Sequence, residues 1–402
     1  RHWPQMLRHG KTRAMIRLSQ SPTDPGSVQD PYPFYARARA AGPLVWWEDY
    51  AMPMATTHAA VNTILRDRRF GREPIEPPPI PPHLAPFYAV EAHSMLELEP
   101  PRHTRLRGLV LRAFTSRRIQ ALGPEIAQLS RDLAARIGPG ETDLLDAFCR
   151  PIPVIVIARL LGVPEEMAPE LLRWSNAMVQ MYQARRTRTE EEEAATAAGD
   201  FTAFLREHVE RRRADPRDDL ITALIAAEEA GERLSMDELI TTCILLLNAG
   251  HEATVHTMGN GIRLCLETGA RPSPDPAPLV EEILRFDPPL HLFTRTAYED
   301  VSLFGHDIRR GDQVGLLLAS AGRDEAAYTE PAVFRPDRGD GPANLAFGAG
   351  LHFCVGAPLA RLELQIALPI LFDTHPGLRL SAPPRYANIY HFHGLERLIV
   401  TA

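Results

Sequence analysis

The chain has 402 residues, 45% of them hydrophobic and 24% charged, which is typical of a globular protein that can bury a large core. Its net charge of −7 argues against a nucleic-acid-binding protein, because such a protein normally carries a basic domain. No run of about 18 apolar residues is present, so no membrane-spanning helix is expected.

The first six residues lack the apolar segment of a signal peptide, and we expect a cytoplasmic protein. The cysteines at 149, 243, 265 and 354 form no C-x-x-C pair, which argues against a structural zinc site or a disulfide framework. Free thiols fit a reducing compartment. We predict one domain over residues 1–402, with residues 1–29 as an irregular lead-in.

A short helix is predicted over residues 32–39, and a hairpin is predicted with strands at residues 45–47 and 52–55. Thr57 is predicted to cap the helix that follows. Prolines then crowd residues 73–86 and exclude a regular helix there. This stretch is either a linker or an ordered active-site loop, and we favour the loop.

A helix is predicted over residues 103–112, with His103 and Arg107 four residues apart on one face. Such a pair could hold an anion, although a solvated arginine face is the simpler interpretation. Residues 143–230 are predicted to form successive helices.

The longest predicted helix begins after Ser235 or Asp237 and continues to about Glu267. Gly250 in its middle costs about 1 kcal/mol relative to alanine. Glu252 lies inside an apolar stretch, where a charge is costly unless it is paired. Local costs of this kind indicate a functional site.

The most informative stretch is residues 347–358, where Cys354 lies among glycines just before a predicted helix. Glycines allow a close approach to a flat ligand, and a helix N-terminus favours a thiolate. These features indicate a haem ligand. A lone cysteine is more often a small core residue, but that does not explain the flanking glycines and His352. A dinucleotide-binding loop is excluded because Phe353 occupies the position of its last glycine.

This stretch resembles the haem-binding signature of the cytochrome P450 family, F-G-x-G-x-H-x-C-x-G, at every fixed position. The resemblance implies a mainly α protein with the cytochrome P450 fold, helical with a smaller β-rich region. It implies haem b with Cys354 as the iron ligand. By the same resemblance, the residues that contact the haem are His103, Arg107, Arg295, His352, Phe347, Gly348 and Gly356. It also implies a buried ion-pair group made of Glu282, Arg285 and Arg338.

The middle of the long helix resembles the oxygen-binding motif of the family, which implies that Ala249, Gly250, Glu252 and Thr254 are the catalytic residues. Ala253 occupies the position where the family carries an alcohol. One residue turns a side chain by about 100°, so Thr254 does not simply replace the missing hydroxyl. Our hypothesis is that Glu252 and ordered water deliver protons, assisted by Thr254 or by a substrate hydroxyl.

The substrate pocket is expected to be mainly apolar, with polar contacts from two of its residues, Asn248 and His251. The predicted lining residues are Phe87, Met178, Leu247, Asn248, His251, Leu292, Phe293 and Phe392. Residues 390–394 are expected to form a hairpin tip that reaches the pocket. The alternating His391 and His393 could suggest a metal site, but without a third ligand this interpretation is not favoured.

The resemblance implies a monooxygenase that inserts one atom of dioxygen into a small or medium apolar organic substrate, with electrons from a ferredoxin and a ferredoxin reductase. The arginines expected to form the basic docking surface for the donor are Arg112, Arg117 and Arg118. Two alternatives stay open. One is a peroxide-driven peroxygenase or a haem isomerase, and the other is a non-catalytic haem sensor or carrier.

Overall fold

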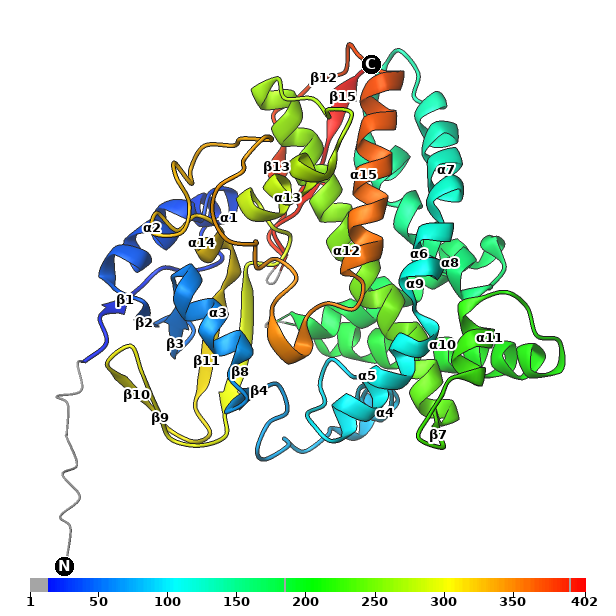
Figure 1. Cartoon of the computed structure of the whole chain (residues 1–402), viewed down its shortest axis with the longest axis horizontal. Coiled ribbons are helices and arrows are strands. Elements are labelled where there is room, and N and C mark those ends of the chain that lie inside the picture. The colour runs from blue at the N-terminus through cyan, green and yellow to red at the C-terminus, as the bar shows by residue number, and fades with distance from the viewer. Residues whose placement is uncertain (1–13, 184–185, 390–391) are drawn as a thin grey trace, which may run out of the picture.

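The computed structural model describes residues 14–183, 186–389 and 392–402. The fold is mainly helical with a smaller sheet region, as predicted (Figure 1). In Figure 1 the six-stranded sheet lies on the left, and most of the helices lie on the right.

The helices follow one another along the chain as α1 (Pro25–Gln29), α2 (Tyr32–Ala41), α3 (His58–Arg66), η1 (Pro82–Leu84), α4 (Ala85–Glu91), α5 (Arg102–Ala113), α6 (Ser116–Ala121), α7 (Gly123–Ala135), η2 (Leu145–Cys149), α8 (Pro151–Leu161), η3 (Glu165–Met167), α9 (Ala168–Val179), η4 (Gln180–Tyr182), α10 (Arg188–Ala214), α11 (Leu220–Ala226), α12 (Met236–Thr268), α13 (Ala277–Phe286), α14 (Leu318–Gly322), η5 (Gly350–His352) and α15 (Ala357–Thr374).

The strands are β1 (Arg17–Leu18), β2 (Leu44–Trp47), β3 (Met52–Ala55), β4 (Phe70–Gly71), β5 (Glu141–Asp143), β6 (Glu228–Glu229), β7 (Glu232–Arg233), β8 (Leu292–Ala297), β9 (Val301–Leu303), β10 (His306–Ile308), β11 (Gln313–Leu317), β12 (Arg379–Leu380), β13 (Arg385–Tyr386), β14 (Leu395–Arg397) and β15 (Ile399–Thr401). The main sheet has the order β1-β2-β3-β11-β8-β4.

Local sequence signals explain several boundaries. The Thr57 side chain accepts a hydrogen bond from the amide of Ala60 and caps α3, as predicted. Ser235 and Glu238 form a capping box at the start of α12. The prediction that residues 1–29 are irregular is wrong for the described part, because β1 pairs in parallel with β2 and Asp24 caps α1. Neither element carries enough apolar periodicity to be recognised in the sequence.

The helix α12 organises the larger hydrophobic core. Its 33 residues pack against α8, α9, α10, α13 and α15. Most of its side chains are buried, so any exposed position in its middle must face a hollow inside the protein. The Cys354 loop leads into α15, which packs against α7 and α12.

Candidate active site

The Cys354 loop is shaped by two left-handed glycines. Gly348 and Gly350 both have φ of +72°, a backbone conformation that suits glycine. A Cβ on Gly350 would lie 2.6 Å from the carbonyl oxygen of Leu65, so no side chain fits there. The Cys354 amide donates to the Phe347 carbonyl at 3.0 Å, which closes the loop and leaves the half-buried thiol at the start of α15.

Burial raises the pKa of the Cys354 thiol. The amides of Gly356 and Ala357 and the charges of Arg107 and Arg361 act in the opposite direction without overcoming it. The helix N-terminus therefore favours the thiolate, as expected, but desolvation is the larger effect on the free thiol. A bound metal ion deprotonates a coordinating thiol outright.

Three of the residues expected to contact the haem lie beside Glu99 or the Cys354 loop, namely His103, His352 and Arg107. The imidazoles of His103 and His352 lie 4.4 Å apart, and His352 Nε2 lies 2.8 Å from the Glu99 carboxylate. Arg107 donates to the carbonyl of Phe353 at 2.7 Å. Both ring nitrogens of His103 are buried and lack a hydrogen-bond partner among the described residues, which is what an absent acceptor would leave behind.

Arg295 completes this electropositive group. Burial, and then the charge of Arg72, lower its pKa to about 10. In the described part of the chain, neither Arg107 nor Arg295 has a carboxylate within ion-pair distance. Buried arginines are normally paired. This donor set fits the two carboxylates of a haem, and the glycine loop beside Cys354 fits its flat face.

The middle of α12 carries an exposed alanine although the flanking turns are buried. Ala249 is exposed, and Ala253, one turn later on the same face, is half-buried. Small side chains therefore border a hollow at the predicted oxygen-binding position. Gly250 is half-buried, and a Cβ there would lie 3.8 Å from the Ile157 side chain. An alanine would therefore fit at this position without a clash.

Glu252 points toward a histidine one turn along α12. Its Oε1 lies 3.3 Å from Nε2 of His256. Burial raises the pKa of Glu252, but the hydrogen bond to His256 and the nearby charges outweigh it, so the net pKa is lowered. The hydroxyl of Thr254 is buried and donates to the carbonyl of Gly250 at 2.7 Å. Thr254 therefore bonds to its own helix, and the predicted relay role for it stays a prediction.

The predicted ion-pair group is confirmed. Arg285 makes two hydrogen bonds of 2.7 Å to the carboxylate of Glu282, and Arg338 reaches the same carboxylate at 3.1 Å. All three side chains are buried. Arg285 also donates to the carbonyls of Gly322 and Pro331, so the group connects α13 to the segment that precedes the cysteine loop.

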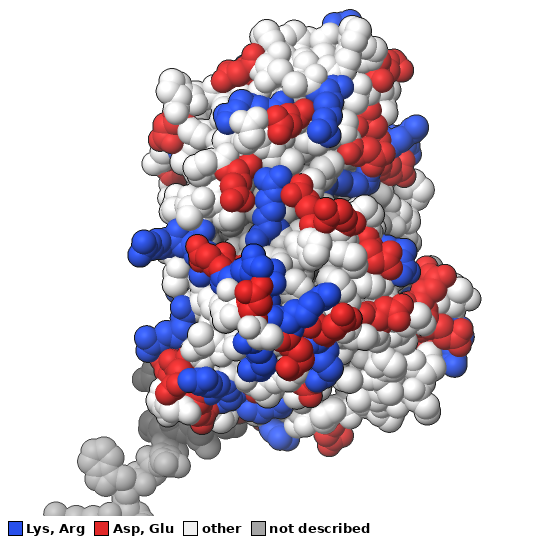
Figure 2. All heavy atoms as spheres, turned by 90° about the vertical axis from the view of Figure 1, so that its right-hand side faces the viewer, with Lys and Arg blue, Asp and Glu red and all other residues white. Residues whose placement is uncertain are grey.

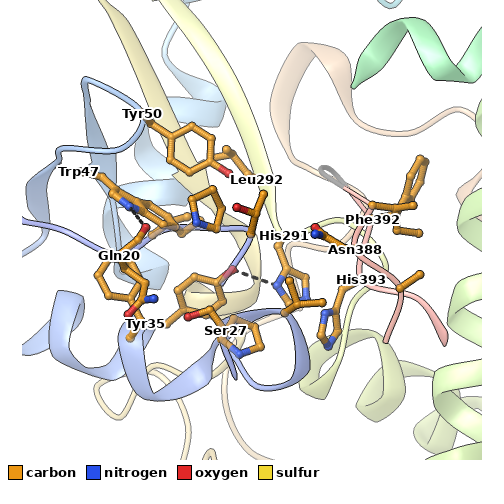
Figure 3. A pocket seen from close by; sticks show the side chains of 18 residues that line it. Gln20, Ser27, Tyr35, Trp47, Tyr50, His291, Leu292, Asn388, Phe392 and His393 are labelled. Carbon is orange, nitrogen blue, oxygen red and sulfur yellow. Dashed lines mark hydrogen bonds between the residues drawn. The ribbon is translucent and has the colours of Figure 1, made fainter. Parts of the chain in front are cut away.

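The predicted pocket residues are divided between two cavities and the core. His251 and Phe392 line a cavity of about 270 Å³, and Phe392 and Leu292 line a smaller one of about 80 Å³ (Figure 3). The predicted residues that line neither cavity are Phe87, Met178, Leu247, Asn248 and Phe293. Met178, Leu247 and Phe87 are buried in the main core. Tyr390 and His391 lie outside the described residues, so their predicted hairpin tip stays a prediction.

The larger cavity is more polar than the sequence suggested. Its polar lining residues are Arg150, Asn176, Gln180, Gln183, His251, Glu252 and His256. The ring nitrogens of His251 and His256 are buried, and Nε2 of His256 lies 3.3 Å from the Glu252 carboxylate. Asn176, Gln180 and Gln183 are spaced by four and three residues, and this helical stripe was the signal that could have revealed them.

The proline-rich segment is ordered, as predicted. His83 in η1 lies 2.5 Å from Glu191 near the start of α10.

The predicted basic docking surface carries less free positive charge than expected, because Arg112 pairs with Glu229 and Arg118 pairs with Asp218. Figure 2 shows positive and negative side chains interspersed over the face at the right of Figure 1. Of the helices in the described ranges, none is long and apolar enough to cross a bilayer.

Comparisons with known proteins agree with this geometry. The family model described as Cytochrome P450 matches residues 34–268 and 278–375. The biotin biosynthesis cytochrome P450 of Bacillus subtilis is 34% identical over 397 residues, which cover 96% of this chain and 100% of the relative. The cytochrome P450 monooxygenase PikC of Streptomyces venezuelae is 35% identical over 379 residues, covering 88% of this chain and 86% of the relative.

Two solved structures share the whole architecture. P450BioI in complex with an acyl carrier protein ligated to hexadec-9Z-enoic acid superposes with a TM-score of 0.87 at 33% identity, covering 94% of this chain and 99% of that one. CalO2 gives a TM-score of 0.87 at 28% identity, covering 95% of this chain and 98% of that one. The match therefore extends over nearly the full length of both chains.

Proposed function

The chain belongs to the cytochrome P450 family, and we propose that it inserts one atom of dioxygen into a mainly apolar organic substrate that also carries hydroxyl groups. We further propose that a ferredoxin and its reductase supply the electrons. As a member of this family the protein is a haem b enzyme of the oxygenase class.

The chain's own residues have separate roles in this proposal. Cys354 would ligate the haem iron, and His103, Arg107, Arg295 and His352 would hold the haem carboxylates. When bound, haem supplies the iron that activates dioxygen. Glu252 would hold and transfer protons, while Ala249 and Ala253 would leave room for dioxygen beside α12. The observation that carries this assignment is the exposed alanine face in the otherwise buried middle of α12.

The cavity lining supports a substrate with hydroxyl groups. Imidazole and amide side chains both donate and accept hydrogen bonds, as a hydroxyl does. Glu252 opposes a carboxylate in the same cavity, because like charges repel. Leu172, Val179, Val255 and Phe392 provide the apolar part of the wall. A site built to hydrogen-bond a hydroxyl discriminates against an analogue that lacks it.

The test is a screen of paired molecules that differ by one hydroxyl, read by the ferric spin shift on ligand binding. Hits are then incubated with NADH, a ferredoxin and its reductase, and products are identified by mass spectrometry. The proposal expects the hydroxylated member of a pair to bind at least tenfold more tightly and to gain one oxygen atom. Equal binding within every pair would contradict the substrate class, and hydroxylation by hydrogen peroxide alone would contradict the electron source.

A further inference from the structure

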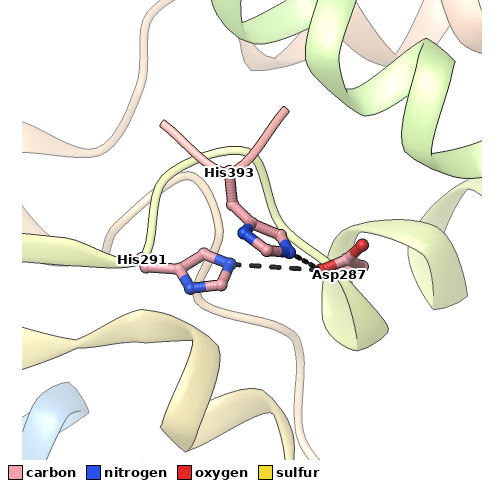
Figure 4. A group of neighbouring side chains, drawn as sticks. All are labelled: Asp287, His291 and His393. Carbon is pink, nitrogen blue, oxygen red and sulfur yellow. Dashed lines mark ion pairs between the residues drawn. The ribbon is translucent and has the colours of Figure 1, made fainter. Parts of the chain in front are cut away.

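Three buried side chains of types that can bind a metal ion converge outside the lining of the larger cavity. Asp287 follows α13, His291 precedes β8, and His393 lies in the C-terminal segment (Figure 4). Nε2 of His393 lies 3.4 Å and Nε2 of His291 4.0 Å from Oδ1 of Asp287. The three ligand atoms all lie within 4.8 Å of one another. We propose that these side chains bind a zinc ion that fastens the C-terminal segment to the end of α13.

An unsatisfied imidazole supports a missing ligand at this position. Nε2 of His291 is buried and has no hydrogen-bond partner in the described part of the chain. Its other nitrogen, Nδ1, lies 3.0 Å from the hydroxyl of Tyr35. When Nδ1 donates to that hydroxyl, Nε2 carries a free lone pair directed at Asp287. Outer hydrogen bonds of this kind fix the tautomer of metal-binding histidines.

The carboxylate is also oriented by its surroundings. Tyr32 donates to Oδ1 of Asp287 at 2.7 Å, and Tyr386 donates to Oδ2. A carboxylate offers about four lone-pair positions, so two hydroxyl donors still leave room for a metal ion. The Tyr386 ring stacks on His393 with centroids 3.6 Å apart and holds that imidazole in place.

The backbones that carry the ligands are fastened to each other. The side-chain amide of Asn260 on α12 donates to the backbone carbonyl of His393 at 2.8 Å and to that of Asp287 at 3.3 Å. The amide of His393 donates to the carbonyl of Pro289 at 2.7 Å. The site is therefore largely preformed, which lowers the entropic cost of binding.

The ligand set and its spacing favour zinc. Two histidines and one carboxylate are a common zinc set, with water as the fourth ligand. Bonds of about 2.1 Å in a tetrahedron place ligand atoms roughly 3.4 Å apart, so the side chains need to move by only about 1 Å. The small cavity lined by His291 and His393 has about 80 Å³, which is room for the water but not for a larger ligand (Figure 3).

Two arginines set the affinity. Arg263 donates to the hydroxyl of Tyr386 at 2.5 Å, and the guanidinium of Arg323 lies 3.9 Å from the Tyr32 ring centre. Both positive charges repel the zinc ion, so zinc binding is weaker than at a site without nearby arginines.

The test uses the haem-loaded protein, stripped with a chelator and titrated with Zn²⁺. Metal analysis is expected to give one zinc per chain beside the haem iron, and zinc-edge X-ray absorption a shell of nitrogen and oxygen only. Zinc is expected to raise the melting temperature, because it binds the folded state alone. His291→Gln and His393→Gln are each expected to weaken binding at least tenfold, and Tyr35→Phe about tenfold.

The matched control is His83→Gln, which removes an imidazole outside the cluster and should leave zinc binding unchanged. Tyr35→Phe removes one hydroxyl and keeps the test decisive if a histidine variant does not fold. Equal zinc binding by Tyr35→Phe and the unaltered protein, a sulfur atom in the zinc shell, or no retained zinc would each overturn the site. None of these readouts depends on oxygenase activity, so failure of the proposed function leaves this test intact.

Discussion

His256 lies one helical turn after Glu252 on α12 and places its Nε2 3.3 Å from the Glu252 carboxylate. This pair stands beside the position where Ala253 replaces the alcohol of the family motif. We therefore expect His256 to position Glu252 for proton delivery. In Glu252→Gln, product formed per NADH consumed should fall at least tenfold, because general acid–base groups contribute about 100-fold or more.

His256→Leu should change the pH dependence rather than abolish activity. His256 helps to lower the pKa of Glu252, and burial alone would raise it. Removing the imidazole therefore raises that pKa, so Glu252 loses its proton only at higher pH. The measurement is product formed per NADH consumed as a function of pH. Its acidic limb should shift to higher pH, and an unshifted limb with normal haem content would show that His256 does not act on Glu252.

Thr254→Val should leave coupling nearly unchanged. The Thr254 hydroxyl is buried and donates to the Gly250 carbonyl, so relaying its proton would require breaking this hydrogen bond. The stability cost should be about 1 kcal/mol, the usual value for one hydrogen bond. The measurement is product per NADH together with urea unfolding, and a large loss of coupling would restore Thr254 as a relay.

Two adjacent glutamates offer a matched test of the buried ion-pair group. Glu282→Ala should destabilise the protein by about 3–5 kcal/mol, because it leaves Arg285 and Arg338 buried without their anion. Glu281→Ala removes a partly exposed partner of Arg361 and should cost about 1 kcal/mol or less. Urea unfolding of the haem-loaded proteins measures both, and equal costs would contradict the structural role of Glu282.

Glu363 in α15 should make stability depend on pH. Burial raises its pKa to about 8, and its Oε1 has no partner among the described residues. In the unfolded chain this carboxyl titrates near its ordinary pKa of 4.5, so the folded state binds more protons between pH 4.5 and 8. Stability is therefore lost as pH rises through this window, by up to about 1.4 kcal/mol per pH unit. Glu363→Gln should flatten that loss in urea unfolding at several pH values, and an unchanged slope would refute the assignment.

Patterns with a local cause were predictable from the sequence. The Thr57 cap, the hairpin of β2 and β3, and the long helix α12 follow from caps, alternation and helical periodicity. The Glu282 group followed from the family resemblance and is present in the structure.

What the sequence did not reveal depends on packing between distant segments. The polar wall from Asn176 to Gln183 meets His251 only after α9 packs on α12. His393 was discounted as a metal ligand because its partners, Asp287 and His291, lie about a hundred residues earlier in the chain. The sequence also does not display burial, which raises the pKa of the Cys354 thiol against the effect of the helix N-terminus.

The spectrum of the reduced protein with bound carbon monoxide tests the role of Cys354 most directly. The unaltered protein should show the red-shifted absorption band of a thiolate-ligated haem, and Cys354→Ser should lose that band while the protein stays folded. Cys265→Ala, which removes a buried thiol from α12, should keep it. A band that survives in Cys354→Ser, or that is absent from the folded and haem-loaded unaltered protein, would contradict the assignment.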